Sequence, residues 1–364
     1  AANVGANTVD STLPLNRVNQ AAGPVFGDPI DMAGGHFLYP NEDLKTGVGE
    51  FPMSLAFNKL YSSASRTKAG ALGKGWTHNW VSTAAVNSDG LQSMGEDSAL
   101  DAAGIIAERL VSLDLMADAA MPLNKMVVAT LGARWVGEQL VGNTVNVRNG
   151  LDGQIFVKLP DGTYSAPPGS SAKLIRNADT TFSYESANKA RLNFNAAGKA
   201  TSYLHPSGVQ VSFTYSGNDL TQVKNSLGRT LTLTNASGRV TNVSDGTRSV
   251  GYAYDASGNL ATFTDATAKA TTFQYDLPGR MTKFFLPANP TVAQVTNVYD
   301  TLERVQTQTN AMGKVWTYHF AGSRTQELGP LGQSRVHYFN GAGKVLKAVT
   351  PTGKPAVTHY RVME

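Results

Sequence analysis

The sequence contains no cysteine and little charge of either sign. Its 364 residues include 31 Lys or Arg and 27 Asp or Glu, which gives a net charge of +4. The lack of cysteine excludes thiolate catalysis, disulfide frameworks and cysteine-type zinc sites. With 41% hydrophobic residues the chain has enough apolar side chains for a core. So small a positive excess excludes a strongly basic nucleic-acid binder, and we expect no nucleic-acid partner.

Long hydrophobic runs are also missing. The best run, residues 126–133, is much shorter than the roughly 18 apolar residues of a membrane helix, and Arg134 follows it. We therefore expect no membrane span. The sequence starts with Ala-Ala-Asn-Val and has no initiator methionine. A mature end left by processing gives such a start, which hints at export, although simple trimming gives the same start.

The usual motifs of catalysis and metal binding are absent. Six histidines are scattered without the His-Glu-x-x-His spacing, and there is no Gly-x-Ser-x-Gly elbow, P-loop lysine or dinucleotide fingerprint in a strand-to-helix context. Equivalent aspartates of successive repeats form a ladder that suggests calcium, but one carboxylate per repeat supplies too few ligands. We predict a protein that is not an enzyme, with no catalytic, cofactor or metal site.

The pattern along the chain predicts four regions. Residues 1–26 are small and polar and predict an extended arm, and residues 27–96 have the short apolar runs of an N-terminal β module. Residues 97–145 predict a two-helix insert, and residues 146–364 return to strands. The expected apolar stripe of the insert consists of Leu100, Ala103, Ile106, Leu110, Leu113 and Ala117 in the first helix and Met126, Ala129, Ala133, Val136 and Leu140 in the second.

The last region is repetitive. Tyr254-Asp255-Ala256-Ser257-Gly258 recurs at Tyr275 and Tyr299, at spacings of 21 and 24 residues. Looser copies begin at Phe194, Thr234 and Phe339, with degenerate ones near Tyr215 and Phe320, so there are about eight units. Each unit has room for two strands and two turns, and alternating aromatic residues precede the turn. The sequence therefore predicts β-hairpins stacked into one spiral antiparallel sheet, a mainly β fold.

The residues at the turns have a structural explanation. An Asp or Asn that opens a turn accepts a hydrogen bond from the backbone two residues later, and a Gly three residues later adopts a positive φ. The predicted turn positions are Asp255, Gly258, Asp276, Gly279, Asp300, Asn340 and Gly343. Two copies depart from this pattern: Glu303 stands at a Gly position, and the register of the Thr234 copy is left open.

The tandem Tyr-Asp copies resemble the Rhs/YD-repeat family, which includes bacterial toxin carriers, the shells of insecticidal toxin complexes and the animal teneurins. The N-terminal module resembles the domain that commonly opens these arrays, through Gly27-Asp28-Pro29-Ile30-Asp31, Phe57-Asn58-Lys59-Leu60-Tyr61 and Leu72-Gly73-Lys74-Gly75-Trp76. The resemblance implies a spiral β-sheet that closes, in longer members, into a hollow shell around a cargo polypeptide. About eight repeats are far fewer than such a shell uses, which favours a short open spiral, a fragment or a subunit completed by assembly.

Three functions follow from this reading. The first is a non-enzymatic structural protein of the bacterial surface or exterior, which self-associates or binds a protein partner at open strand edges and forms a filament or shell. The second is the encapsulating portion of a Rhs polymorphic toxin. The third is a glycan-binding adhesin in which Trp76, His78 and Trp80 form an exposed platform for sugars, the alternative being that these rings pack in the core.

Overall fold

A computed structural model describes residues 29–88, 99–113, 122–149, 152–340, 343–350, 352–353 and 355–357. The predicted arm, residues 1–26, lies outside these ranges. The described residues divide into two compact units, one within Ser82–Asn149 and Gly153–Pro206 and the other mainly within Ser11–Val81 and Ser207–Glu364. The N-terminal module and most of the repeats therefore belong to one unit, whereas the helical segment shares its unit with the first strands after it.

The first unit combines two helices with two groups of strands. One sheet has the strand order β10-β9-β8-β7, and strands β11 to β14 pair in sequence, each antiparallel to the next. The elements are β7 (Ser82–Asn87), α2 (Ala99–Ser112), α3 (Pro122–Leu140), β8 (Thr144–Asn149), β9 (Asp152–Lys158), β10 (Tyr164–Ser165), β11 (Lys173–Arg176), β12 (Phe182–Glu185), β13 (Arg191–Phe194) and β14 (Ala200–Leu204).

The two predicted helices are present and pack against each other. Ala103 and Val136 of the predicted stripe are buried, and Ala129 and Ala133 are half-buried. The prediction is wrong for Met126 and Leu113, which are 69% and 64% exposed. Leu113 follows Ser112, the last residue of α2. Ala117 and the side chain of Leu100 lie outside the described part.

The second unit begins with the N-terminal module. Its elements are β1 (Ile30–Asp31), β2 (His36–Thr46), β3 (Leu55–Ser62), the 3-10 helix η1 (Ser63–Ser65), β4 (Ala69–Gly70), β5 (Gly73–Lys74) and β6 (Trp76–His78). Four strands form a sheet in the order β1-β2-β3-β6, and β4 pairs with β5. A β-bulge interrupts the pairing of β2 with β3, because Glu42 is opposite Asn58 and Leu44 is opposite Phe57. Asp43 is the extra residue of this bulge.

The repeats of this unit are a continuous row of hairpins, β15 to β29, in which each strand pairs antiparallel with the next among the described residues. Their bounds are β15 (Gln210–Ser216), β16 (Asp219–Asn225), β17 (Thr230–Ala236), β18 (Arg239–Ser244), β19 (Ser249–Tyr254), β20 (Leu260–Thr264), β21 (Ala270–Leu277), β22 (Arg280–Phe285), β23 (Val295–Tyr299), β24 (Val305–Asn310), β25 (Val315–Ala321), β26 (Arg324–Leu328), β27 (Ser334–Phe339), β28 (Val345–Val349) and β29 (Pro355–Val357).

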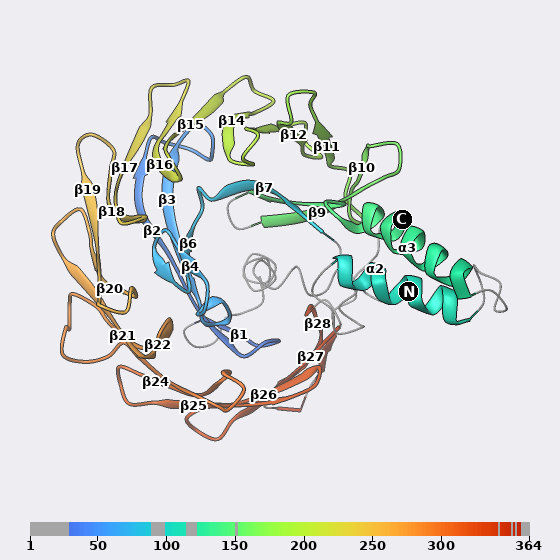
Figure 1. Ribbon diagram of the computed structural model, residues 1–364. Coiled ribbons are helices and arrows are strands. Elements are labelled where there is room, and N and C mark those ends of the chain that lie inside the picture. The colour runs from blue at the N-terminus through green and yellow to red at the C-terminus, as the bar shows by residue number, and fades with distance from the viewer. Residues whose placement is uncertain are drawn as a thin grey trace. The chain divides into compact units, whose positions relative to one another are not determined.

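The hairpin prediction is confirmed, since every predicted copy opens a hairpin from β13/β14 to β27/β28. Within the second unit the row of hairpins curves, and β2, β3 and β6 of the module lie on its inner side (Figure 1). The alternating residues before each turn, such as Phe213, Tyr252 and Phe273, are buried on that side. The core of the unit therefore lies between the module and the repeat sheet.

The structure resolves the register of the Thr234 copy. A register shift falls at Asn235, which pairs with Val240, just as Tyr254 pairs with Leu260 in the next repeat. The Thr234 copy therefore has a turn one residue shorter, and Asn235 is the residue equivalent to Tyr254. Alignment without a gap places Thr234 there, which is wrong by one residue.

Most turn positions have the expected hydrogen bonds. The Asp255 Oδ1 atom accepts from the N–H groups of Ser257 and Asn259, both at 2.9 Å, and Gly258 has a φ of +79°. The Asp300 carboxylate likewise accepts from the backbone of Leu302 and Arg304.

The last copy follows the same rule. The Asn340 side chain accepts from the Lys344 N–H at 2.9 Å, and Gly343 has a φ of +73°. These hydrogen bonds from the backbone to the Asp or Asn side chain stabilise the turns, as the sequence pattern predicts.

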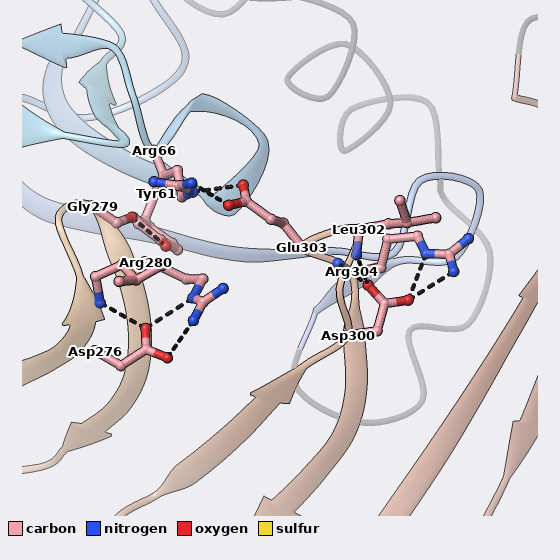
Figure 2. Close-up of polar contacts among 10 residues, drawn as sticks. Tyr61, Arg66, Asp276, Gly279, Arg280, Asp300, Leu302, Glu303 and Arg304 are labelled. Carbon is pink, nitrogen blue, oxygen red and sulfur yellow. Dashed lines mark hydrogen bonds and ion pairs between the residues drawn. The ribbon is translucent and has the colours of Figure 1, made fainter.

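Asp276 differs from this rule. The residue two positions later is Pro278, which has no N–H to donate. The Asp276 carboxylate instead accepts from the guanidinium of Arg280 at 2.9 and 2.7 Å, as Figure 2 shows, and this ion pair lowers the pKa of Asp276. Gly279 still takes a positive φ, of +76°.

Candidate functional site

The candidate site is the contact between the N-terminal module and the inner side of the repeat sheet, here called the module–sheet interface. An aromatic cluster lies at its centre. The Tyr39 ring of β2 has its centroid 4.9 Å from that of Phe284 and 5.5 Å from that of Phe273, and the Trp76 ring lies 5.0 Å from Phe273. These edge-on contacts are the arrangement that aromatic quadrupoles favour.

Backbone groups of the repeats also bind the module. Val240, Met281 and Val305 occupy the same position in three hairpins, at or next to the start of the strand that follows the turn. The Val240 N–H donates to the Ala71 carbonyl at 2.8 Å, and the Val305 N–H donates to the Gly35 carbonyl at 2.8 Å. The module thus satisfies equivalent buried donors in three of the four hairpins from β17/β18 to β23/β24.

The Tyr61 side chain binds the third of these donors, the Met281 N–H. Its hydroxyl accepts from the Met281 N–H at 2.8 Å. It donates to the Gly279 carbonyl at 2.8 Å, as Figure 2 shows. The side chain is fully buried, and burial raises the pKa of the Tyr61 hydroxyl well above its usual value, so it stays protonated. A single hydroxyl therefore pairs a donor and an acceptor of the Asp276 hairpin.

The tyrosines of the repeats link each hairpin to the one before it. The Tyr254 hydroxyl donates to the Val240 carbonyl at 2.6 Å, and the Tyr275 hydroxyl donates to the Leu260 carbonyl at 2.8 Å. The Tyr299 hydroxyl donates to the Met281 carbonyl at 2.7 Å. Each tyrosine therefore binds the equivalent residue of the preceding hairpin through its carbonyl. Val240 and Met281 are two of the residues whose N–H groups bind the module, and Leu260 occupies the same position in its own hairpin. This explains why an aromatic residue with a hydroxyl precedes the turn aspartate.

An ion pair lies at the edge of the interface. The Arg66 guanidinium, just after η1, binds both carboxylate oxygens of Glu303, with an Nε to Oε2 distance of 2.6 Å (Figure 2). Glu303 has a φ of +63° at the position where the other turns have Gly. The hydrogen bonds from Arg66 are the main reason that the pKa of Glu303 lies below its usual value. Glu303, which replaces the Gly of the repeat pattern, therefore contacts the module through its side chain.

A second charged pair is buried in the core of the unit. The Lys59 ammonium contacts the Asp43 carboxylate, and both side chains are completely inaccessible to solvent. The Tyr252 hydroxyl of β19 donates to the other Asp43 oxygen at 2.7 Å. Burial lowers the pKa of Lys59 from its usual 10.5 to about 8, against the opposing effect of the Asp43 charge.

The predicted sugar platform is wrong. Trp76, His78 and Trp80 are 2%, 3% and 5% exposed. The Trp76 Nε1 atom donates to the Tyr275 hydroxyl at 2.9 Å, and the His78 ring stacks on Phe57 with centroids 5.1 Å apart. No open ring face remains at these residues on which a sugar can stack, so the alternative, packing in the core, describes them.

Sequence reasoning missed the polar residues of the interface. Tyr61 and Lys59 fall inside a motif that carries the family resemblance, and an isolated lysine among Phe57, Leu60 and Tyr61 was a usable signal of a buried charge. Asp43 and Arg66 gave no such signal. The first depends on the bulge and the second on a partner 237 residues away.

Within the described ranges, no group of three or more His, Asp or Glu side chains lies close enough together to hold a metal ion. No helix in those ranges has the length and apolar character needed to cross a membrane.

Two parts of the chain match known protein families. Residues 27–100 match a family described as a domain of unknown function (DUF6531), and residues 170–330 match the Teneurin YD-shell family. No curated protein matches the chain.

Two similar solved structures are a Photorhabdus luminescens Tc holotoxin pore and a TcdB2-TccC3-Cdc42 crystal structure. The first is 11% identical with a TM-score of 0.32, over 57% of this chain and 15% of that one. The second is 12% identical with a TM-score of 0.35, over 59% of this chain and 15% of that one. This chain thus spans about one seventh of those chains. The YD-shell match over residues 170–330, together with the tandem hairpins in that region, identifies the repeats of this chain as Rhs/YD repeats.

Proposed function

We propose that this protein is a non-enzymatic wall segment of a YD shell, in which the N-terminal module seals the inner side of the first repeats and helps enclose another polypeptide. The observation that carries the proposal is the set of equivalent repeat N–H groups, at Val240, Met281 and Val305, that bind the module. A module that binds the same position in three hairpins of one sheet fixes the spacing and curvature of the wall.

The residues of the interface favour a permanent structural contact. Its aromatic rings are buried, and its hydrogen bonds join backbone to backbone or pass through a fully buried hydroxyl. Such a surface has the composition of a domain core rather than of a transient contact. The module thus serves as a fixed lining of the wall.

The enclosure part of the proposal is tested with a reporter polypeptide. A segment with one protease site is fused after Glu364 and the purified fusion is treated with that protease. The proposal expects slow cleavage in the folded fusion and fast cleavage after denaturation. The control carries the same segment on a long Gly/Ser linker and should be cut quickly in both states. Fast cleavage of the folded test fusion would show an open wall and contradict enclosure.

Self-assembly is a second candidate function. The last strand of the repeat sheet, β29, pairs with β28 on one side only within the described part of the chain. Unpaired strand edges recruit further strands, so the edge is suited to bind a protein partner or a second copy. Light scattering and negative-stain electron microscopy of the purified protein test this candidate. Filaments, rings or shells would support it, whereas monomers over a wide concentration range would contradict it.

Export to the bacterial surface or exterior belongs to the same proposal. The repeats resemble shells of insecticidal toxin complexes, and such complexes act outside the cell that makes them. Immunodetection in cell fractions and culture medium of the producing organism tests this location. Retention of all the protein in the cytoplasm would contradict it.

A further inference from the structure

A lysine and an aspartate are enclosed together in the core of the second unit, where the wall function makes no use of them. Asp43 is the extra residue of the bulge in β2, and Lys59 lies on the neighbouring strand β3, opposite Asn41. A bulge redirects one side chain without ending the strand pairing. Here it accompanies a direct contact between the Asp43 carboxylate and the Lys59 amine.

The surroundings of this pair exclude water. Both side chains have no accessible surface, and the Phe263 ring lies over the Lys59 Nζ atom with its centroid 3.5 Å away. Tyr39 provides a second ring 5.9 Å from the same atom. In such an environment two opposite charges lose most of their hydration, so a proton transfer within the contact, which removes both charges, costs less than it does in water.

The neutral pair has the groups of an amide-forming reaction. A neutral amine is a nucleophile, and a protonated carboxyl group has a hydroxyl that leaves as water. The lowered pKa of Lys59, about 8, helps this amine lose its proton.

Tyr252 supplies the third group of the arrangement. Its hydroxyl donates to the Asp43 Oδ2 atom at 2.7 Å, and burial, with the Asp43 charge next, keeps its pKa well above the usual value. It therefore remains a donor and stabilises the negative charge that develops on this oxygen during attack. Asn41 donates to the other oxygen, Oδ1, at 2.6 Å.

We propose that Lys59 and Asp43 form an intramolecular amide bond that crosslinks β2 to β3. The Nζ atom attacks Cγ of the protonated Asp43 carboxyl group, a C–N bond forms, and the C–O bond to the hydroxyl breaks. The hydroxyl leaves with one amine proton as water, so the reaction needs no other reactant. Tyr252 and Phe263 belong to the repeat sheet, so the bond forms only when the module is seated on it.

The mass of the denatured full chain tests the proposal. The expected mass is lower than that of the sequence by one water. The matched variant Asp43→Ala should have its full sequence mass, and so should Lys59→Met. An unmodified wild-type chain with its full mass would overturn the proposal.

Peptide mapping of the wild-type chain locates the residues that lost the water, and it does not depend on whether a variant folds. Trypsin should release residues 18–45 and 46–66 as one joined species, because an acylated Lys59 is no longer a cleavage site. Separate peptides with free Lys59 would overturn the proposal. A loss of water at Asp161-Gly162 or Asp245-Gly246 would also overturn it, because an aspartate before glycine loses water by succinimide formation.

Tyr252→Phe tests the assigned role of the hydroxyl. This variant keeps the ring, so the module should still dock, but we expect the crosslinked fraction after a fixed refolding time to fall at least several-fold. The control Tyr338→Phe, at a hydroxyl with no hydrogen-bond partner in the described ranges, should crosslink like the wild type. Equal crosslinking of both variants would remove Tyr252 from the reaction.

Discussion

The hydroxyl of Tyr61 and the carbonyl of Gly279 are hydrogen bonded at 2.8 Å although 218 residues separate them. The same hydroxyl accepts from the Met281 N–H, so one side chain of the module forms hydrogen bonds with two backbone groups of a repeat hairpin. The repeat sheet and the module are thus joined through backbone atoms that every hairpin has, and the tyrosine supplies the specific contact.

Removing this hydroxyl should weaken the second unit. Tyr61→Phe leaves a buried N–H and a buried C=O without their partner, which costs about 1–3 kcal/mol of unfolding free energy. Chemical denaturation followed by tryptophan fluorescence measures this loss. Tyr338→Phe is the control and should stay within about 0.5 kcal/mol of the wild type. Equal stability of all three proteins would contradict the role of Tyr61.

Gly279 should tolerate no side chain. A Cβ atom there would lie 2.1 Å from the backbone oxygen of Arg66, so the module must move. Gly313 has a similar positive φ, but a Cβ atom there meets nothing within 4 Å. Gly313→Ala should therefore show only the cost of the left-handed backbone, about 1–2 kcal/mol. Gly279→Ala should lose clearly more stability and make the module accessible to limited proteolysis, and equal losses would refute this contact.

The Arg66–Glu303 pair should make stability depend on pH. The folded-state pKa of Glu303 lies below its usual value of 4.5, so the stabilisation is complete well above 4.5 and disappears as the pH falls through the lower folded value. Since the Glu303 side chain is 40% exposed, the contribution is at most about 1 kcal/mol.

Glu303→Gln provides the measurement. Its stability difference from the wild type should be present at neutral pH and vanish as the pH falls through the lowered folded-state pKa of Glu303. Glu138→Gln removes a carboxylate from the exposed pair with Arg134 and should change stability little at any pH. A Glu303→Gln difference that stays constant with pH would argue against the ion pair.

Trp76 should act as a core residue. Trp76→Ala removes a buried ring and its hydrogen bond to Tyr275, so we expect a loss of about 3–5 kcal/mol by denaturation. Trp135→Ala, in which the removed ring is 62% exposed, should cost about 0.5 kcal/mol or less. Similar effects of the two substitutions would contradict the packing described for Trp76.

Several features of the fold could be predicted because they depend on neighbours in sequence. Asp255 accepts from groups two and four residues away, and Gly258 needs only a local positive φ. The alternation of buried and exposed residues in β17, Thr230–Ala236, has the period of two that any strand imposes. The hairpins and their order could therefore be read without knowing what they pack against.

Other residues could not be interpreted in this way because their partners are distant. Glu303 interrupts the turn pattern, and only Arg66 of the module explains it. Trp76 and His78 are residue types typical of an exposed sugar-binding surface, but in the folded protein both side chains are buried in the core. The burial of an aromatic side chain depends on what covers it, and here the covering strands come some 200 residues later.

The sequence by itself determined the repeat, the hairpin, the turn chemistry and the family resemblance, because each follows from contacts within about twenty residues. Only the tertiary structure decided that the module lines the inner side of the repeat sheet, that Tyr61 and Arg66 bind repeat turns, and that Asp43 meets Lys59. These depend on curvature accumulated over many hairpins and on one bulge, which bring distant residues together in a way that no local pattern contains.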